Sequence, residues 1–137
     1  MDMWFSEVHT PDVKLSLRTA QQLYSGKSEW QDIAVLETPA FGKILTLNGH
    51  VLFSDADDFV YNEMVVHVPM AVHPNPKKVL VLGGGDGGVA QILTLYPEVE
   101  QIDIVEPDEL LIDVCRQYFP DFAVGLDDAR VTIYCQD

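Results

Sequence analysis

Positive charge is scarce in this sequence of 137 residues: 8 Lys and Arg stand against 22 Asp and Glu, for a formal net charge of −14. A surface with this balance repels nucleic-acid phosphates and anionic lipid headgroups. We therefore expect no nucleic acid and no membrane as a partner. A small cationic ligand is favoured instead, because the protein's own field attracts it.

Long apolar runs are also missing. No stretch approaches the roughly 20 residues that a membrane-spanning helix needs, and the opening MDMWFSEVHT lacks the basic segment and apolar stretch of a secretory signal. Cysteine is limited to Cys115 and Cys135, without CxxC spacing. Such a pair is typical of free thiols in a reducing compartment. The sequence thus favours a cytoplasmic protein.

The first 57 residues are typical of a small antiparallel β-domain. Apolar and polar residues alternate over 13–18, as in a half-buried strand, and a second β-prone run covers 30–38. Asn48 and Gly49 stand between two further β-prone runs. An Asn-Gly pair favours the tight turn of a hairpin, because both residues accept positive φ.

Residues 58–76 predict a helix that connects this domain to a second one. Asp57 or Asp58 can cap its N-terminus, where a carboxylate is favourable. Pro69 is expected to kink or interrupt the helix, which ends at the His-Pro-Asn-Pro sequence 73–76.

From residue 77 to 137 the pattern becomes α/β. The predicted elements are strand 79–82, helix 89–96, strand 102–105, helix 108–119 and strand 131–135. This order predicts the first half of a Rossmann-like, doubly wound parallel sheet, in which the apolar strand 79–82 is covered on both faces. Three parallel strands leave an open apolar edge. We therefore expect the chain to be a piece of a longer one, or its sheet to be completed by another subunit.

A glycine-rich loop, GGGDGG at 83–88, lies between the first predicted strand and helix of this part and satisfies G-x-G-x-x-G. Glu106 ends the next strand about 20 residues farther on, where an acid can accept both ribose hydroxyls. Together they predict a nucleoside site. The alternative is that the glycines only allow close helix–strand packing and that Glu106 is a solvated strand end.

Asp86, inside this loop, bears on which nucleoside would bind. A pyrophosphate would sit at the helix N-terminus, and two like charges at about 4 Å repel by roughly 1–4 kcal/mol at dielectrics of 80 to 20. Asp86 therefore disfavours NAD or FAD and favours a cationic S-adenosyl ligand, best of all one without the α-carboxylate. The alternative is that Asp86 caps the helix that follows.

The loop with its preceding strand, VLVLGGGDGG, followed by IVEPD at 104–108, resembles the nucleoside-binding core of the spermidine synthases, the polyamine aminopropyltransferases. The resemblance extends in order over nearly the whole chain. It includes Trp4-Phe5, Trp30-Gln31, the stretches 41–49 and 58–64, His67-Val68-Pro69, His73-Pro74 and the stretch 126–130.

This resemblance implies a role for each matching residue. Gly83, Gly85 and Gly87 would form the loop around the donor, decarboxylated S-adenosylmethionine. Glu106 would hold its ribose, Asp86 its ammonium, Gln31 its nucleoside–thioether end and Asp137 its adenine amino group. Tyr61 and Asn62, with Asp86, would line the path of the acceptor amine.

The resemblance also implies a reaction and an assembly. Putrescine would take the aminopropyl group, giving spermidine and 5′-methylthioadenosine, with no metal and no redox cofactor. The protein would be a homodimer or homotetramer joined through the β-domains. The family's general-base Asp lies beyond Asp137, so no catalytic residue is expected within this chain, and the chain alone is expected to be inactive. Relatives have His or Gln where Asn62 stands, which leaves the acceptor open.

Three other functions stay open. An S-adenosylmethionine-dependent methyltransferase would begin its sheet in the same way, although Asp86 disfavours the donor's carboxylate. A non-catalytic acidic assembly module would use the hairpin domain as an interface. An NAD-dependent enzyme is disfavoured by Asp86. His67 and His73 stand six residues apart without a partner acid or thiol at ligand spacing, so no metal site is predicted.

Overall fold

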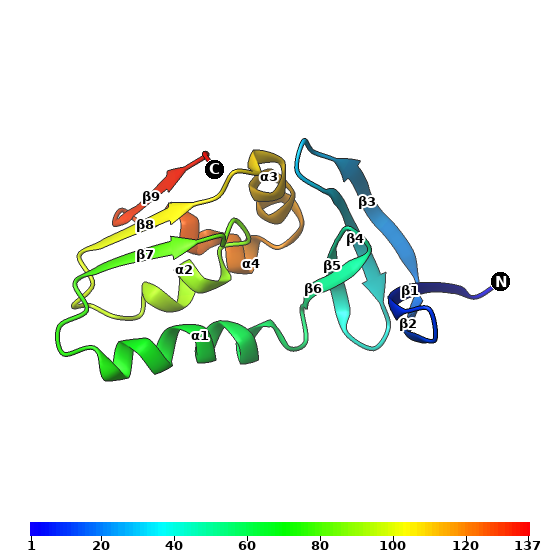
Figure 1. The fold of residues 1–137 in the computed structure, drawn as a ribbon, viewed down its shortest axis with the longest axis horizontal. Helices are drawn as coiled ribbons and strands as arrows, with labels where there is room; N and C mark the ends of the chain where they lie inside the picture. The colour runs from blue at the N-terminus through cyan, green and yellow to red at the C-terminus, as the bar shows by residue number, and fades with distance from the viewer. The chain divides into compact units, whose positions relative to one another are not determined.

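The computed structural model describes all 137 residues, which form two compact units, Met1–Asp58 and Phe59–Asp137 (Figure 1). The predicted fold class is confirmed, since an antiparallel β-domain is followed by the start of a Rossmann-like fold. The first unit ends one residue later than predicted, and the predicted connecting helix lies almost wholly in the second unit. No helix is both long and apolar enough to cross a bilayer.

The first unit contains two antiparallel sheets. The strands of the two-stranded sheet are β1 (Met3–Thr10) and β2 (Val13–Thr19), and those of the four-stranded sheet, paired in chain order, are β3 (Gln21–Lys27), β4 (Asp32–Thr38), β5 (Gly42–Leu47) and β6 (His50–Ser54). Strands β1 and β3 were not predicted as separate strands from the sequence. Neither shows a continuous alternation of apolar and polar residues.

The core of the first unit lies on β4 and β5. Ile33 and Val35 of β4, within the predicted β-prone run 30–38, are almost fully buried together with Ile44 and Leu45 of β5. The alternating run of β2 behaves differently, because its Leu15 is 48% exposed. The run is a strand as predicted, but its apolar face is only partly buried within this chain.

The turn between β5 and β6 is the predicted Asn-Gly hairpin. Asn48 and Gly49 have φ of 51° and 78°, and Leu47 pairs directly with His50 across the two-residue loop. These φ values are those that a tight hairpin turn requires, and so the sequence prediction is confirmed.

The second unit is a three-stranded parallel sheet with helices. Its elements are α1 (Asp58–Val72), β7 (Lys78–Leu82), α2 (Gly88–Leu93), β8 (Gln101–Val105), α3 (Glu109–Tyr118), α4 (Pro120–Ala123), the 3-10 helix η1 (Val124–Asp127) and β9 (Val131–Tyr134). The strand order is β7-β8-β9, with Leu82 beside Val105 and Val105 beside Tyr134. The carboxyl ends of the three strands therefore meet at one edge of the sheet.

Helix α1 packs into the core of this unit through Val66 and Met70, which cluster with residues of α2 and β8. Pro69 was expected to kink or to interrupt this helix; the helix continues past Pro69 to Val72, so the interruption does not occur. Proline removes one helical hydrogen bond. The burial of Val66 and Met70 on either side of it supplies packing that holds the helix together.

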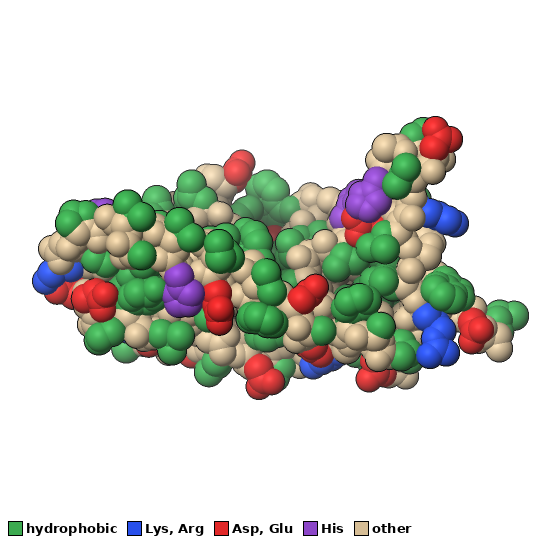
Figure 2. Space-filling model, turned by 90° about the horizontal axis from the view of Figure 1, so that it is seen from below, with side chains coloured by type: hydrophobic (Ala, Val, Ile, Leu, Met, Phe, Trp, Pro, Cys, Tyr) green, Lys and Arg blue, Asp and Glu red, His purple; other side chains and the backbone are tan.

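One face of β7 is not covered in this chain. Val79 and Val81 pack against the core, whereas Leu80 and Leu82 are 62% and 78% exposed. The prediction of a strand covered on both faces is therefore wrong for these 137 residues. Helix α1 is also apolar on its outer side. Its exposed apolar side chains are Phe59, Val60, Met64, Val68 and Val72. Figure 2, which views the molecule from below Figure 1, shows many hydrophobic side chains on that face.

Candidate functional site

The glycine loop and Glu106 lie side by side at the carboxyl edge of the sheet. The Gly83 N–H donates to the Val105 carbonyl at 2.9 Å, and the Glu106 N–H donates to the Tyr134 carbonyl at 3.0 Å. These bonds extend the pairing of the strands by one residue. The edge where ligands bind in open α/β sheets is thus formed here by the predicted residues.

The loop follows a path that glycine allows. Gly84 and Gly87 have φ of 131° and 87°, and the Gly87 N–H donates to the Gly84 carbonyl at 3.0 Å. At Gly85 the reason for glycine is steric, because a Cβ there would lie 2.6 Å from Cγ of Glu106. The loop is therefore shaped to receive the Glu106 side chain.

Glu106 is only 6% exposed and is held by backbone donors. Its Oε2 accepts the N–H groups of Gly84 at 3.3 Å and Gly85 at 3.1 Å, and its Oε1 accepts that of Asp108 at 3.1 Å. The alternative of a solvated strand end is wrong. The glycines do allow close packing, and it is this packing that places Glu106 against the loop.

Asp86 is half-buried and points its Oδ1 at the start of α2, where it accepts the Gly88 N–H at 2.7 Å. The N-cap residue of α2 is Gly87, and Asp86, one residue before it, accepts the first N–H of the helix. Burial raises the pKa of Asp86; the Gly88 N–H opposes this shift, and the negative charge of Glu106 adds to it. A desolvated carboxylate with this environment gains from a positively charged ligand.

Cys115 lies behind the site, on α3, and is fully buried. Burial raises the pKa of its thiol, and the negative charges of Asp86 and Glu106 raise it further. The thiol is therefore neutral and unreactive at physiological pH. Cys135 is exposed, and both cysteines are free, as the sequence predicts.

Besides Asp86, the residues predicted to line the acceptor path are Tyr61 and Asn62, which differ in exposure. Tyr61 is 67% exposed, whereas Asn62 is buried and its amide lies against Gly88, leaving no room there for a Cβ. Asn62 thus contacts the residue whose N–H holds Asp86. The acceptor role of both residues stays a prediction.

Two predicted donor residues lie outside this group of contacts. Asp137 follows the end of β9 by three residues and is exposed. Gln31 lies in the first unit, in the turn between β3 and β4, where its N–H donates to Ser28 Oγ at 3.1 Å. Their roles toward a nucleoside stay predictions.

Asp108 takes part in the site, although it was not among the predicted site residues. Its N–H reaches Glu106, and its side chain caps α3. The capping could have been recognised, because Asp108 is the first residue of the predicted helix 108–119 and Asp favours helix N-termini; the bond to Glu106 has no signal in the sequence.

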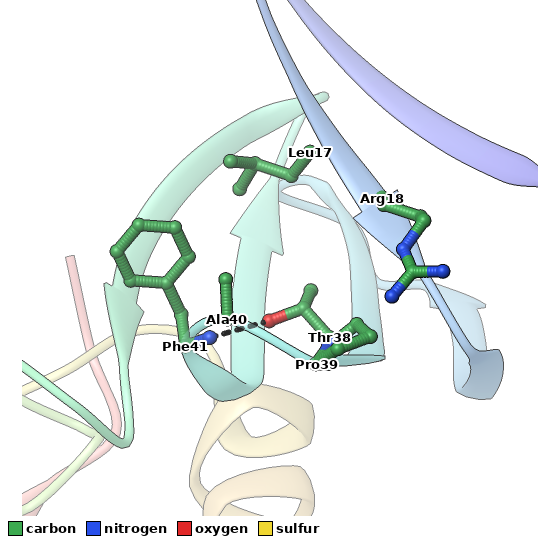
Figure 3. Close-up of a pocket in the computed structure, with 6 residues that line it drawn as sticks. All are labelled: Leu17, Arg18, Thr38, Pro39, Ala40 and Phe41. Atoms are coloured by element: carbon green, nitrogen blue, oxygen red, sulfur yellow. Dashed lines mark hydrogen bonds between the residues drawn. The ribbon is translucent and has the colours of Figure 1, made fainter.

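The first unit also contains a depression of about 270 Å³ that the sequence analysis did not predict (Figure 3). Its lining residues are Leu17, Arg18, Thr38, Pro39, Ala40 and Phe41. The Phe41 N–H donates to Thr38 Oγ1 at 3.1 Å and shapes the turn at its base. None of the predicted donor or acceptor residues lines it.

Comparison with known proteins places this arrangement in a family. Residues 58–137 match the family described as the spermine/spermidine synthase domain, and residues 3–54 match the spermidine synthase tetramerisation domain. The chain is 87% identical over all its 137 residues to the polyamine aminopropyltransferase of Streptococcus pneumoniae TIGR4 and 80% identical to that of Streptococcus uberis. It covers 48% of each, so it spans about half the length of these curated relatives.

Solved structures agree. The spermidine synthase of Thermotoga maritima is 38% identical with a TM-score of 0.95, over 98% of this chain and 48% of that one. A spermidine synthase in complex with the transition-state analogue AdoDATO is 38% identical with a TM-score of 0.94, over 98% of this chain and 46% of that one. The chain therefore belongs to the spermine/spermidine synthase family.

Proposed function

We propose that this chain provides the donor-binding part of a spermidine synthase, which transfers an aminopropyl group from decarboxylated S-adenosylmethionine to putrescine. The products are spermidine and 5′-methylthioadenosine. The observation that carries the proposal is the desolvated Asp86 carboxylate in the glycine loop, with the buried Glu106 beside it. A donor with a sulfonium, an ammonium and no carboxylate fits this site, because Asp86 would attract its ammonium and Glu106 would hold its ribose.

The charges at the loop support a cationic donor over the common anionic cofactors. A pyrophosphate at this loop would face Asp86 and would be repelled by roughly 1–4 kcal/mol at about 4 Å. An ammonium at the same place is attracted by a similar amount and restores the stabilisation that Asp86 loses on burial. The α-carboxylate of S-adenosylmethionine is disfavoured for the same reason, which weighs against a methyltransferase.

The reaction forms a bond between the amine nitrogen of putrescine and the aminopropyl carbon next to sulfur. The carbon–sulfur bond breaks, and its electron pair returns to sulfur, which becomes the neutral thioether of 5′-methylthioadenosine. The proton released by the attacking amine passes to a general base, an Asp that we expect beyond Asp137. Because the sulfonium is already a good leaving group, we propose that no metal and no redox cofactor takes part.

The proposal extends to the acceptor, the assembly and the location. Tyr61 and Asn62 would line the acceptor path with Asp86, since Asn62 contacts the Gly88 end of the same loop. Residues 3–54 match a tetramerisation domain, which supports a homodimer or homotetramer joined through the first unit. The two free thiols are compatible with a cytoplasmic location.

Calorimetric titration with decarboxylated S-adenosylmethionine and, separately, S-adenosylmethionine tests the donor. Charge-assisted contacts are worth roughly 1.5–3 kcal/mol, so we expect the decarboxylated donor to bind at least about tenfold more tightly. Adenosine serves as the control, because it shares the nucleoside but carries no charge near Asp86. Equal affinity for the two donors, or a preference for S-adenosylmethionine, would favour a methyltransferase instead.

A further inference from the structure

Asp108 is almost completely buried, at 2% exposure, and connects α3 to Glu106. Its Oδ1 accepts the Leu111 N–H at 3.3 Å, which caps the start of α3, and its own N–H donates to Oε1 of Glu106 at 3.1 Å. The side chain thus fixes the backbone that carries one of the donors to Glu106.

The donors to Glu106 are divided between its two oxygens. Gly84 and Gly85 both donate to Oε2, and Asp108 alone donates to Oε1. A carboxylate held at one oxygen can still turn its other oxygen, whereas one held at both has a fixed plane. The contact from Asp108 is therefore the one that determines the orientation of Oε1.

We propose that Asp108 is a positioning residue for the nucleoside site, and that its cap on α3 holds the Glu106 carboxylate in the orientation that accepts a ribose hydroxyl. This inference rests on the proposed function. An ionised carboxylate has about four acceptor positions, and three are used by backbone donors here. The acceptor position that remains points in a defined direction only while the Asp108 N–H holds Oε1.

The cap, and not the charge, is what this role requires. Asn and Asp are about equally good at the N-cap, whereas Ala is much poorer and destabilises the helix. Asp108→Asn keeps a side-chain oxygen for the Leu111 N–H and is the conservative variant. Asp108→Ala removes the cap. Asp108→Gly also removes the cap but destabilises the helix less, so it replaces the Ala variant if that variant does not fold.

The test measures binding of adenosine and of 2′,3′-dideoxyadenosine, which lacks the diol, by calorimetry to the parent chain and the variants. We expect the parent chain to prefer adenosine. Asp108→Ala, or Asp108→Gly, should lose about tenfold in affinity for adenosine and leave the weaker binding of dideoxyadenosine unchanged. Asp108→Asn should retain the preference. Circular dichroism verifies that each variant is folded.

The contrary results separate this inference from the function on which it rests. Equal losses for the two nucleosides would show a merely structural role and overturn the inference, as would a loss of preference in Asp108→Asn. A parent chain that binds neither nucleoside, or binds both equally, would overturn the proposed role of Glu106 and the inference with it. An Ala or Gly variant that keeps the full preference would overturn the inference alone.

Discussion

At the scale of single residues, the site sets two carboxylates in different environments. Glu106 accepts three backbone N–H groups, whereas Asp86 accepts one from Gly88 and is desolvated. Buried carboxylates with few donors lower the stability of the folded state when they are charged. With the ammonium role that we propose for Asp86, ligand binding and stability oppose each other at this residue, as often occurs at binding sites.

The raised pKa of Asp86 predicts how its substitution changes stability with pH. A raised folded-state pKa gives a stabilising contribution that is fully present below the unfolded pKa and is lost as pH rises through the folded one. Asp86→Asn should therefore unfold at a higher temperature than the parent chain at pH 7, and the difference should shrink toward pH 3. Asn retains an oxygen for the Gly88 N–H, so this hydrogen bond is kept.

The same substitution should weaken binding of the decarboxylated donor by roughly tenfold to a hundredfold, the usual value of a charge-assisted contact. Adenosine binding should change little. Thermal unfolding between pH 3 and pH 8 measures the change in stability, and calorimetry measures the change in donor affinity. Asp113 is exposed, so Asp113→Asn is the matched control for the loss of one charge. Equal losses for donor and adenosine would contradict the ammonium role of Asp86.

At the scale of elements, Arg130 connects the start of β9 to the end of α2. Its guanidinium donates to both carboxylate oxygens of Asp128, at 2.9 and 3.0 Å, and to the carbonyls of Thr94, Tyr96 and Val99 at 2.9 to 3.1 Å. All five N–H donors of arginine are thereby used. The side chain of Arg130, which directly precedes β9, thus fixes the turn between α2 and β8.

Substitution of Arg130 by Lys should lower the unfolding temperature by several degrees, because an ammonium cannot reproduce the planar fork of donors. Arg130→Ala should lower it further. Arg116, which donates through one nitrogen to Asp127 at 3.1 Å on an exposed surface, provides the control, and Arg116→Ala should have little effect. Circular dichroism measures the unfolding temperatures. Similar decreases for the Arg130 and Arg116 variants would contradict this role of Arg130.

The Arg130 guanidinium lowers the pKa of Asp128 to about 2, chiefly through its side-chain hydrogen bonds. The contribution of this pair to stability is therefore present above the ordinary Asp pKa near 3.9 and is lost as pH falls toward about 2. The stability difference between the parent chain and Arg130→Ala should accordingly narrow between pH 4 and pH 2.

Local signals in the sequence predicted the elements that have a strong pattern. The Asn48-Gly49 hairpin, the glycine loop and the amphipathic helix α3 are each determined by a few neighbouring residues. The strands β1 and β3 and the course of α1 through Pro69 depend on tertiary packing, which no short pattern encodes. Within the site, Asp86 and Glu106 could be named from the motif. The Asp108 contact arises from the folded backbone and could not.

At the scale of the whole molecule, strong negative charge and exposed apolar surface occur together. The chain carries a net charge of −14, and the two-stranded sheet of the first unit exposes Met3, Trp4, Val8, Val13 and Leu15 by 48% to 60%. Apolar surface of this kind favours association, whereas like net charges oppose it. The proposed assembly through residues 3–54 should therefore depend on salt.

We expect the mass of the chain in sedimentation equilibrium to rise from low salt to about 0.3 M, because the screening length falls below 10 Å and repulsion between copies weakens. Trp4→Glu should remove association, since it places a charge within the apolar sheet surface. Leu95→Glu is the matched control, because Leu95 is also exposed but lies outside residues 3–54. A monomeric mass at all salt concentrations, or equal effects of the two substitutions, would argue against assembly through the first unit.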